Sequence, residues 1–72
     1  MLVKGIKNTK HVAYIIYLNN QYNNTITQNT EVNWDWCWKE ITFYNPGDYL
    51  IKVYDDKNSF VASGNLRIKY RD

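Results

Sequence analysis

Apolar residues recur at every second position along most of this chain, and no window repeats them at helical spacing over three turns. This alternation is typical of β-strands, in which successive side chains point to opposite faces. β-Branched and aromatic residues, which favour strands, occur throughout. The pattern predicts an all-β fold of about seven short strands, near residues 2–7, 11–18, 22–28, 31–38, 40–44, 48–55 and 59–70.

Turn residues separate these segments. The stretch LNNQ at 18–21 is rich in Asn, which tolerates the positive φ that tight hairpins need. In NPG at 45–47, Pro46 has no N–H to give to a ladder. DDKN at 55–58 is expected to close the last hairpin, and Gly64 to mark a β-bulge. Short strands with turns at this spacing indicate an antiparallel sandwich or a small barrel, and we expect the sandwich.

The chain is short, so we expect one domain over residues 1–72. A domain of this size buries only about 60% of the surface that its unfolded chain exposes. Cys37 is the only cysteine and His11 the only histidine, which excludes an internal disulfide and a structural zinc site. Three Trp, seven Tyr and two Phe offer a dense aromatic core instead. Stability must then come from this core, from association with other chains, or from both.

The net charge and the targeting features of the sequence do not identify the class of partner. A net charge of +2 neither requires nor excludes nucleic acid. The apolar run VAYIIYL at 12–18 is too short to span a bilayer, so membrane insertion is not expected. The N-terminus lacks the apolar region of a signal peptide, which favours a cytoplasmic or virion-associated protein. Ten Asn residues hint at the AT-rich genome of a low-GC bacterium or its phage.

The stretches NPGDYLIKVYD and FVASGNLRIKYRD carry a family resemblance. They resemble the E–F corner and the F–G hairpin of immunoglobulin-like domains, and are similar to fibronectin type III and to Ig-like modules of bacterial surface and phage proteins. The resemblance covers residues 41–71. It implies a corner at Pro46 and Gly47, where the hydroxyl of Tyr49 binds backbone a few residues upstream. The Cys pair of antibody domains is absent, and Ile51 stands at the second position.

Three tryptophans in NWDWCWKE fall on one side of the predicted strand 31–38. Trp34, Trp36 and Trp38 share a face, and Cys37 points the other way together with polar residues. We expect this Trp row to lie on the inner face, because the opposite face is mostly polar.

The interior of a sandwich is too thin to hold every apolar side chain of this sequence. Its sheets lie only about 10 Å apart, and segment 11–18 is apolar on both faces. Since no helix is predicted to cover it, part of the surplus is expected to meet a protein partner or a second copy of the chain. The residues expected to bind this partner are Ile15, Tyr17, Trp34, Trp36 and Tyr54.

No enzyme, cofactor or metal site is predicted. His11 has no nucleophile at a motif spacing, Cys37 is expected to be a small inert residue, and the carboxylates show no acid–base spacing. Asp55 and Asp56 fall in a turn, where Asp is common for conformational reasons. The sequence therefore favours a non-enzymatic interaction or assembly module, such as a structural unit of a virion or cell surface, or a small protein inhibitor.

Two other classes of binding module remain as alternatives. A Trp row on the outside would make a platform for sugar rings, which predicts a carbohydrate-binding module. Arg67, Lys69 and Arg71 on one face of the last segment allow a β-barrel that binds single-stranded nucleic acid. We disfavour nucleic acid, because charges on an edge strand also prevent edge-to-edge pairing.

Overall fold

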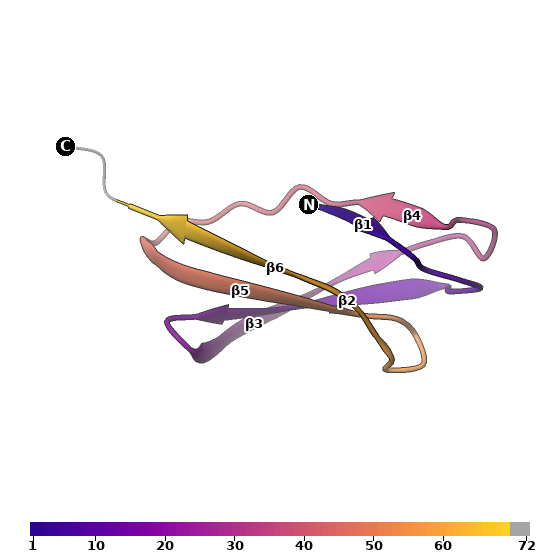
Figure 1. Ribbon diagram of the computed structural model, residues 1–72, viewed down its shortest axis with the longest axis horizontal. Helices are drawn as coiled ribbons and strands as arrows, with labels where there is room; N and C mark the ends of the chain where they lie inside the picture. Colours follow the sequence, from indigo (N-terminus) through magenta and orange to yellow (C-terminus); the bar gives the residue numbers. More distant parts are fainter. Residues whose placement is uncertain (70–72) are drawn as a thin grey trace.

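The computed structural model describes residues 1–69 and contains six β-strands. Four of them form an antiparallel sheet in the order β3-β2-β5-β6, and β1 and β4 form a second, two-stranded antiparallel sheet (Figure 1). The strands are β1 (Leu2–Lys4), β2 (His11–Leu18), β3 (Gln21–Asn29), β4 (Trp36–Trp38), β5 (Gly47–Tyr54) and β6 (Phe60–Ile68). The all-β prediction is confirmed, with six strands rather than seven.

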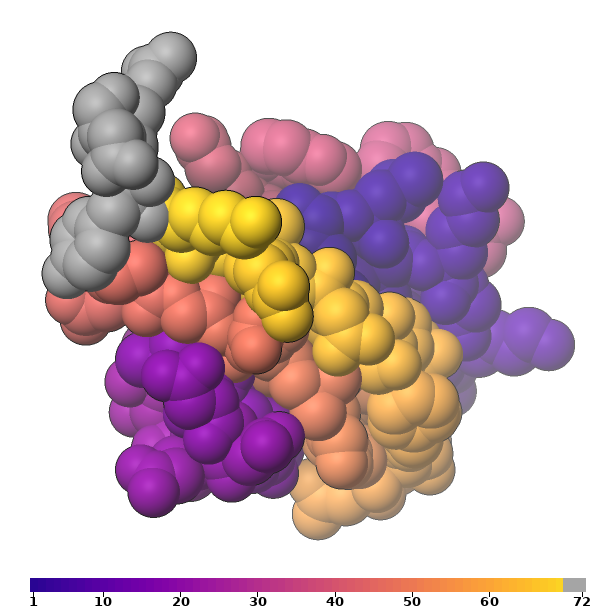
Figure 2. All heavy atoms as spheres, turned by 60° about the vertical axis from the view of Figure 1, so that its left-hand side comes forward, coloured from indigo at the N-terminus to yellow at the C-terminus, as the bar shows by residue number. Residues whose placement is uncertain are grey.

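The two sheets share one hydrophobic core. In Figure 1 the small sheet lies over one face of the large sheet, and in Figure 2 the N-terminal residues (indigo) lie against β6 (yellow). The core consists of the inward side chains of β1, β2, β4 and β5 together with one loop residue: Val3, Val12, Tyr14, Ile16, Cys37, Tyr49, Ile51, Val53 and Ile6. All the fully buried residues of the large sheet therefore lie on its two central strands, β2 and β5.

The predicted turns at 18–21 and 55–58 are present. Asn19 and Asn20 join β2 to β3 with φ values of 50° and 67°, the left-handed conformation that a two-residue hairpin turn requires. In the second turn, Asn58 has a φ of 61°. At the start of β5, Gly47 has a φ of 142°, and a Cβ there would lie 2.6 Å from Leu18 Cδ1. This position therefore requires glycine.

The region between β3 and β5 differs from the prediction. The amide of Trp34 donates to the carbonyl of Glu31 at 3.0 Å, so residues 31–34 form a turn and only Trp36–Trp38 is extended. Residues 40–44 form no strand. Ile41 and Phe43 pack, half-buried, against the core. Hydrophobic contacts hold this segment without backbone pairing to another strand. An alternating sequence pattern does not distinguish this arrangement from a paired strand.

Two smaller predictions for β6 are wrong. Gly64 pairs in regular register with Ile51, and the bulge lies nearer the turn, where Val53 pairs with Ala62 but Tyr54 pairs with Phe60. In the sequence Leu66 alternates with Arg67, which predicts that Leu66 points inside, but Leu66 is 41% exposed on this edge strand. The expected end of this strand, at Tyr70, lies outside the described residues.

Candidate binding surfaces

The Trp row faces outward, which overturns the prediction that it lies inside. Trp34, Trp36 and Trp38 are 41%, 56% and 55% exposed, whereas Cys37 is 2% exposed. Cys37 pairs with the buried Val3 in the small sheet, so both side chains point into the core. The space beneath β4 is small, and it accepts a thiol where it would not accept an indole.

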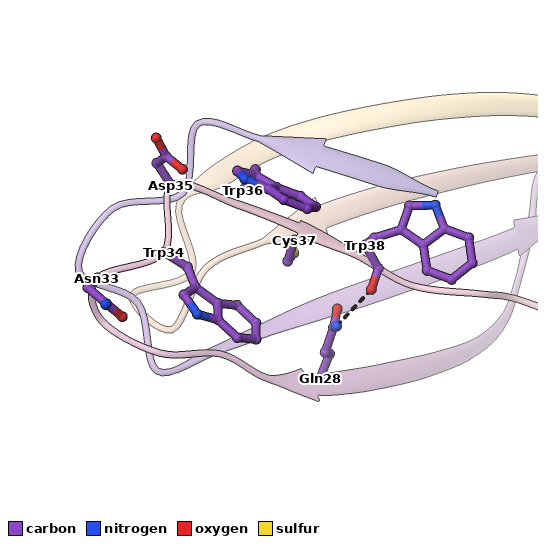
Figure 3. A pocket seen from close by; sticks show the side chains of 7 residues that line it. All are labelled: Gln28, Asn33, Trp34, Asp35, Trp36, Cys37 and Trp38. Carbon is purple, nitrogen blue, oxygen red and sulfur yellow. Dashed lines mark hydrogen bonds between the residues drawn. The ribbon is translucent and has the colours of Figure 1, made fainter.

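The indoles surround a cavity of about 440 Å³, which we call the Trp hollow (Figure 3). Its lining residues come from β3, from the loop before β4 and from β4 itself: Gln28, Asn33, Trp34, Asp35, Trp36, Cys37 and Trp38. In Figure 3, Trp34 and Trp38 lie on either side of Gln28, and Asn33 and Asp35 lie at the loop end. A concave site with aromatic walls and a few polar groups has the composition of a small-ligand pocket.

Hydrogen bonds hold the base of the Trp hollow. The hydroxyl of Tyr14 donates to Gln28 Oε1 at 2.6 Å, and Gln28 Nε2 donates to the backbone carbonyl of Trp38 at 2.9 Å. The Tyr14 hydroxyl also lies 3.6 Å from Cys37 Sγ. Gln28 thus links the large sheet to the outer edge of β4, and its orientation is fixed at both ends of its amide.

Burial raises the pKa of Tyr14, and the contact with Cys37 adds to this effect. Its side chain is fully buried. The hydroxyl therefore keeps its proton at neutral pH and continues to donate to Gln28. The link between the two sheets requires this protonated form.

A second surface lies on the opposite side of the large sheet. The outward side chains of β2 and β5, with two aromatic residues from the neighbouring strands, form what we call the outer sheet face: Ala13, Ile15, Tyr17, Leu50, Lys52, Tyr54, Tyr22 and Phe60. The rings of Tyr17 and Tyr22 meet edge-on with centroids 6.4 Å apart, and those of Tyr54 and Phe60 at 5.9 Å. Lys52 Nζ lies 5.6 Å from the Tyr17 ring centroid.

The five residues predicted to bind a partner do not form one site. Ile15, Tyr17 and Tyr54 lie together on the outer sheet face, where β2 pairs with β5. Trp34 and Trp36 line the Trp hollow on the other side of the molecule. Sequence reasoning named Trp38 in the Trp row but not among the partner-binding residues, and it missed Gln28 at the hollow and Leu50, Tyr22 and Phe60 on the outer sheet face. The strand register alone brings these residues beside the predicted ones.

Tyr49 lies at the entry to β5, next to the turn at Pro46 and Gly47. The hydroxyl of the buried Tyr49 donates to the carbonyl of Asn45, four residues upstream, at 2.7 Å. Its ring lies 4.4 Å from that of Phe43, measured between centroids. Pro46 and Gly47 are half-buried at the turn that leads into β5. These contacts anchor the segment before β5 to the core.

Two ion pairs and an acidic turn engage five of the charged side chains. Arg67 Nε lies 2.7 Å from Asp48 Oδ1, which neutralises part of the proposed basic strip; Arg71 lies outside the described residues. Asp55 accepts from the amides of Lys57 and Ser59, as a turn residue does. A hydrogen bond from the Lys10 amide lowers the pKa of Asp56.

Residues 1–69 contain no cluster of three or more His, Cys, Asp or Glu side chains that could hold a metal ion. None of the described elements is a helix of the length and hydropathy that crossing a bilayer would require. Comparison with known proteins assigns no family: no family model, curated protein or solved structure matches this chain.

Proposed function

We propose that this protein is a non-enzymatic interaction module that associates with a protein, in the first instance a second copy of itself, through the outer sheet face. The observation that carries the proposal is the predominantly apolar composition of this face. Between β2 and β5, Tyr17 pairs with Leu50 and Ala13 with Tyr54, while Ile15 pairs with Lys52. No element of residues 1–69 packs over this face.

The composition of this face differs from that of an ordinary solvated sheet. An antiparallel sheet with one face in water normally alternates apolar residues inside with polar residues outside. Here the outward face of β5 carries the apolar residues Leu50 and Tyr54 beside the charged Asp48 and Lys52. Covering apolar area releases about 25 cal/mol per Å², and aromatic residues are enriched at the cores of protein interfaces. Covering this face in a protein interface would therefore be favourable.

We also propose that the chain is a small Ig-like β-sandwich of the kind found in bacterial surface and phage proteins. The Tyr49–Asn45 hydrogen bond and the β5–β6 hairpin support this assignment. Such modules carry no activity in their fold, so their function lies in their surfaces. The proposal therefore describes a structural unit of a surface or virion assembly, or an inhibitor that occupies a protein target.

Sedimentation velocity of the full chain tests the proposal. We expect a reversible dimer as the concentration rises from about 1 to about 500 μM, a range suited to a weak interface. Ile15→Lys places a charge at the centre of the face and should abolish the dimer. Trp34→Lys, on the other side of the molecule, should leave it unchanged.

A chain that stays monomeric over the whole range would overturn self-association. Loss of the dimer in Trp34→Lys, with Ile15→Lys still dimeric, would move the interface to the Trp hollow. Circular dichroism of both variants shows whether they retain the β fold.

A further inference from the structure

The Trp hollow has a chemistry that the outer sheet face lacks. We infer that the Trp hollow binds a saccharide, stacked on the indoles of Trp34 and Trp38, with its hydroxyls bonded to the side chains of Asn33 and Asp35. This site is separate from the proposed protein interface, since the two surfaces lie on opposite sides of the core.

The walls of the hollow suit a ligand with flat apolar faces. The pyranose ring presents C–H groups on its faces, and these pack against the electron-rich face of an indole. Trp34 and Trp38 lie on either side of Gln28, and both remain largely exposed in the free chain. The volume of about 440 Å³ is within the range of small-ligand sites and suits a ligand of disaccharide size.

The rim of the hollow suits a ligand with many hydroxyls. Asn33 and Asp35 are exposed, and their side chains make no hydrogen bond with another residue of the hollow (Figure 3). An apolar peptide side chain would desolvate these groups without replacing their hydrogen bonds, which costs free energy. Sugar hydroxyls both donate and accept, so they satisfy an amide and a carboxylate together.

The base of the hollow is organised before any ligand arrives. The Gln28 amide is held by Tyr14 and by the Trp38 carbonyl, and the Asp35 carbonyl accepts from the Gly5 amide at 3.0 Å. The Trp34 backbone is held by the turn that begins at Glu31. Because these backbone positions are fixed, binding does not have to order the loop, and less conformational entropy is lost.

A second cavity extends the site. A hollow of about 400 Å³ is lined by Lys4, Gly5, Ile6, Lys7, Asp35 and Trp36. The two cavities share Asp35 and Trp36. A saccharide longer than two units can therefore continue past Trp36 into the second cavity. Among residues 1–69, Asp35 is the only charged residue that lines the Trp hollow itself, and its carboxylate would repel the phosphates of a nucleic acid.

Fluorescence titration with defined oligosaccharides tests the inference. Every tryptophan of the chain lines the hollow and Trp36 also lines the second cavity, so a change in Trp emission reports on these two cavities. The probes are cellohexaose, chitohexaose, maltohexaose and mannohexaose, added to the full chain. We expect at least one to shift the emission, with a Kd of about 0.1–1 mM. Isothermal calorimetry with the same sugars provides a readout that does not depend on fluorescence.

Variants separate the hollow from the rest of the surface. Trp34→Ala and Trp38→Ala should each weaken binding about tenfold or more, because each removes a stacking face. Phe60→Ala, at an exposed aromatic residue on the outer sheet face, should leave the Kd unchanged. The two-unit sugar of the same series should bind more weakly than the hexasaccharide if the second cavity takes part.

Three results would overturn the inference. The first is that none of the sugars changes the emission or releases heat at about 10 mM. The second is that sugar binding survives in both Trp34→Ala and Trp38→Ala. The third is that a pool of random dodecapeptides changes the emission while the sugars do not. Equal affinity for the two-unit and six-unit sugars would overturn the extension into the second cavity. Because Ile15→Lys should abolish the dimer without affecting the sugar, failure of this inference is distinct from failure of the proposed interface.

Discussion

Strands β4 and β5 each have one buried face and one exposed face, but they differ in which face carries the larger side chains. In β5 the large apolar residues Tyr49 and Ile51 are buried. In β4 the large indoles of Trp36 and Trp38 are exposed, and the smaller Cys37 is buried. Alternation therefore divides a strand into two faces, but the space under the strand decides which face is inside.

The difference follows from what each strand covers. β5 is a central strand between β2 and β6, and its inner side chains fill the middle of the core. β4 has only three residues and pairs with β1, whose Val3 already occupies the space beneath the small sheet. The Tyr14 hydroxyl, 3.6 Å from Cys37 Sγ, fills the remainder. An inward indole at position 37 would overpack this region.

The largest expected effect comes from charging the inner face of β4. Cys37→Lys should destabilise the fold by more than about 3 kcal/mol, because it buries an unpaired ammonium group beneath the small sheet. Trp36→Lys, one residue away on the exposed face, should change the free energy of unfolding by less than about 1 kcal/mol. Urea denaturation measures both. Equal losses in the two variants would mean that β4 does not have the orientation described.

A smaller loss is expected from the inner face of β5. Ile51→Ala removes a side chain that is 6% exposed at the centre of the core, and should cost about 2–4 kcal/mol. Leu50→Ala is the matched control, since Leu50 is the adjacent outward residue and only half-buried. A Leu50 variant as unstable as the Ile51 variant would show that the outer sheet face is covered in the free protein.

Local turn chemistry and central strands were predictable from the sequence. The Asn19–Asn20 turn and the inner face of β5 follow from residue preferences that act over a few positions. The Tyr49 hydrogen bond was expected from the resemblance and is also local, since its acceptor is four residues upstream. In these regions local preference and tertiary contacts favour the same arrangement.

The Trp hollow was not predictable to the same extent, because it depends on contacts between distant residues. The exposure of Trp36 depends on Val3, and the fixed position of Gln28 depends on Tyr14, fourteen residues away. The segment at 40–44 alternates like a strand, but it pairs with none of the six strands of residues 1–69. Alternation cannot distinguish a paired strand from an extended segment that only packs.

Removing one hydroxyl from the start of β5 should have a moderate effect. Tyr49→Phe deletes the hydrogen bond to the Asn45 carbonyl and should cost about 1–2 kcal/mol. Tyr44→Phe serves as control, because Tyr44 is 89% exposed and its hydroxyl can bond to water. Thermal unfolding of the two variants gives the comparison. A melting temperature unchanged by Tyr49→Phe would contradict the assignment of a corner tyrosine and weaken the Ig-like proposal.

The smallest expected effect is a change with pH in the free energy of unfolding, and it depends on Tyr14, which lies beneath β4. Because the folded-state pKa of Tyr14 is raised, the native protein keeps a proton that the unfolded chain loses near pH 10. This contribution is fully present below pH 10, and it declines as pH rises toward the folded-state pKa, by at most about 1.4 kcal/mol per pH unit. The informative quantity is the difference in the free energy of unfolding between the parent and the Tyr14→Phe variant.

The Tyr14→Phe variant should be less stable than the parent at pH 8, since Gln28 loses its donor, and the gap should narrow as the pH rises above 10. Urea denaturation at several pH values measures this gap. A gap that stays constant to pH 11 would mean that the Tyr14 hydroxyl ionises as readily in the folded protein as in the unfolded chain. Tyr14 would then be in contact with water, and Cys37 and β4 would not seal the core above it.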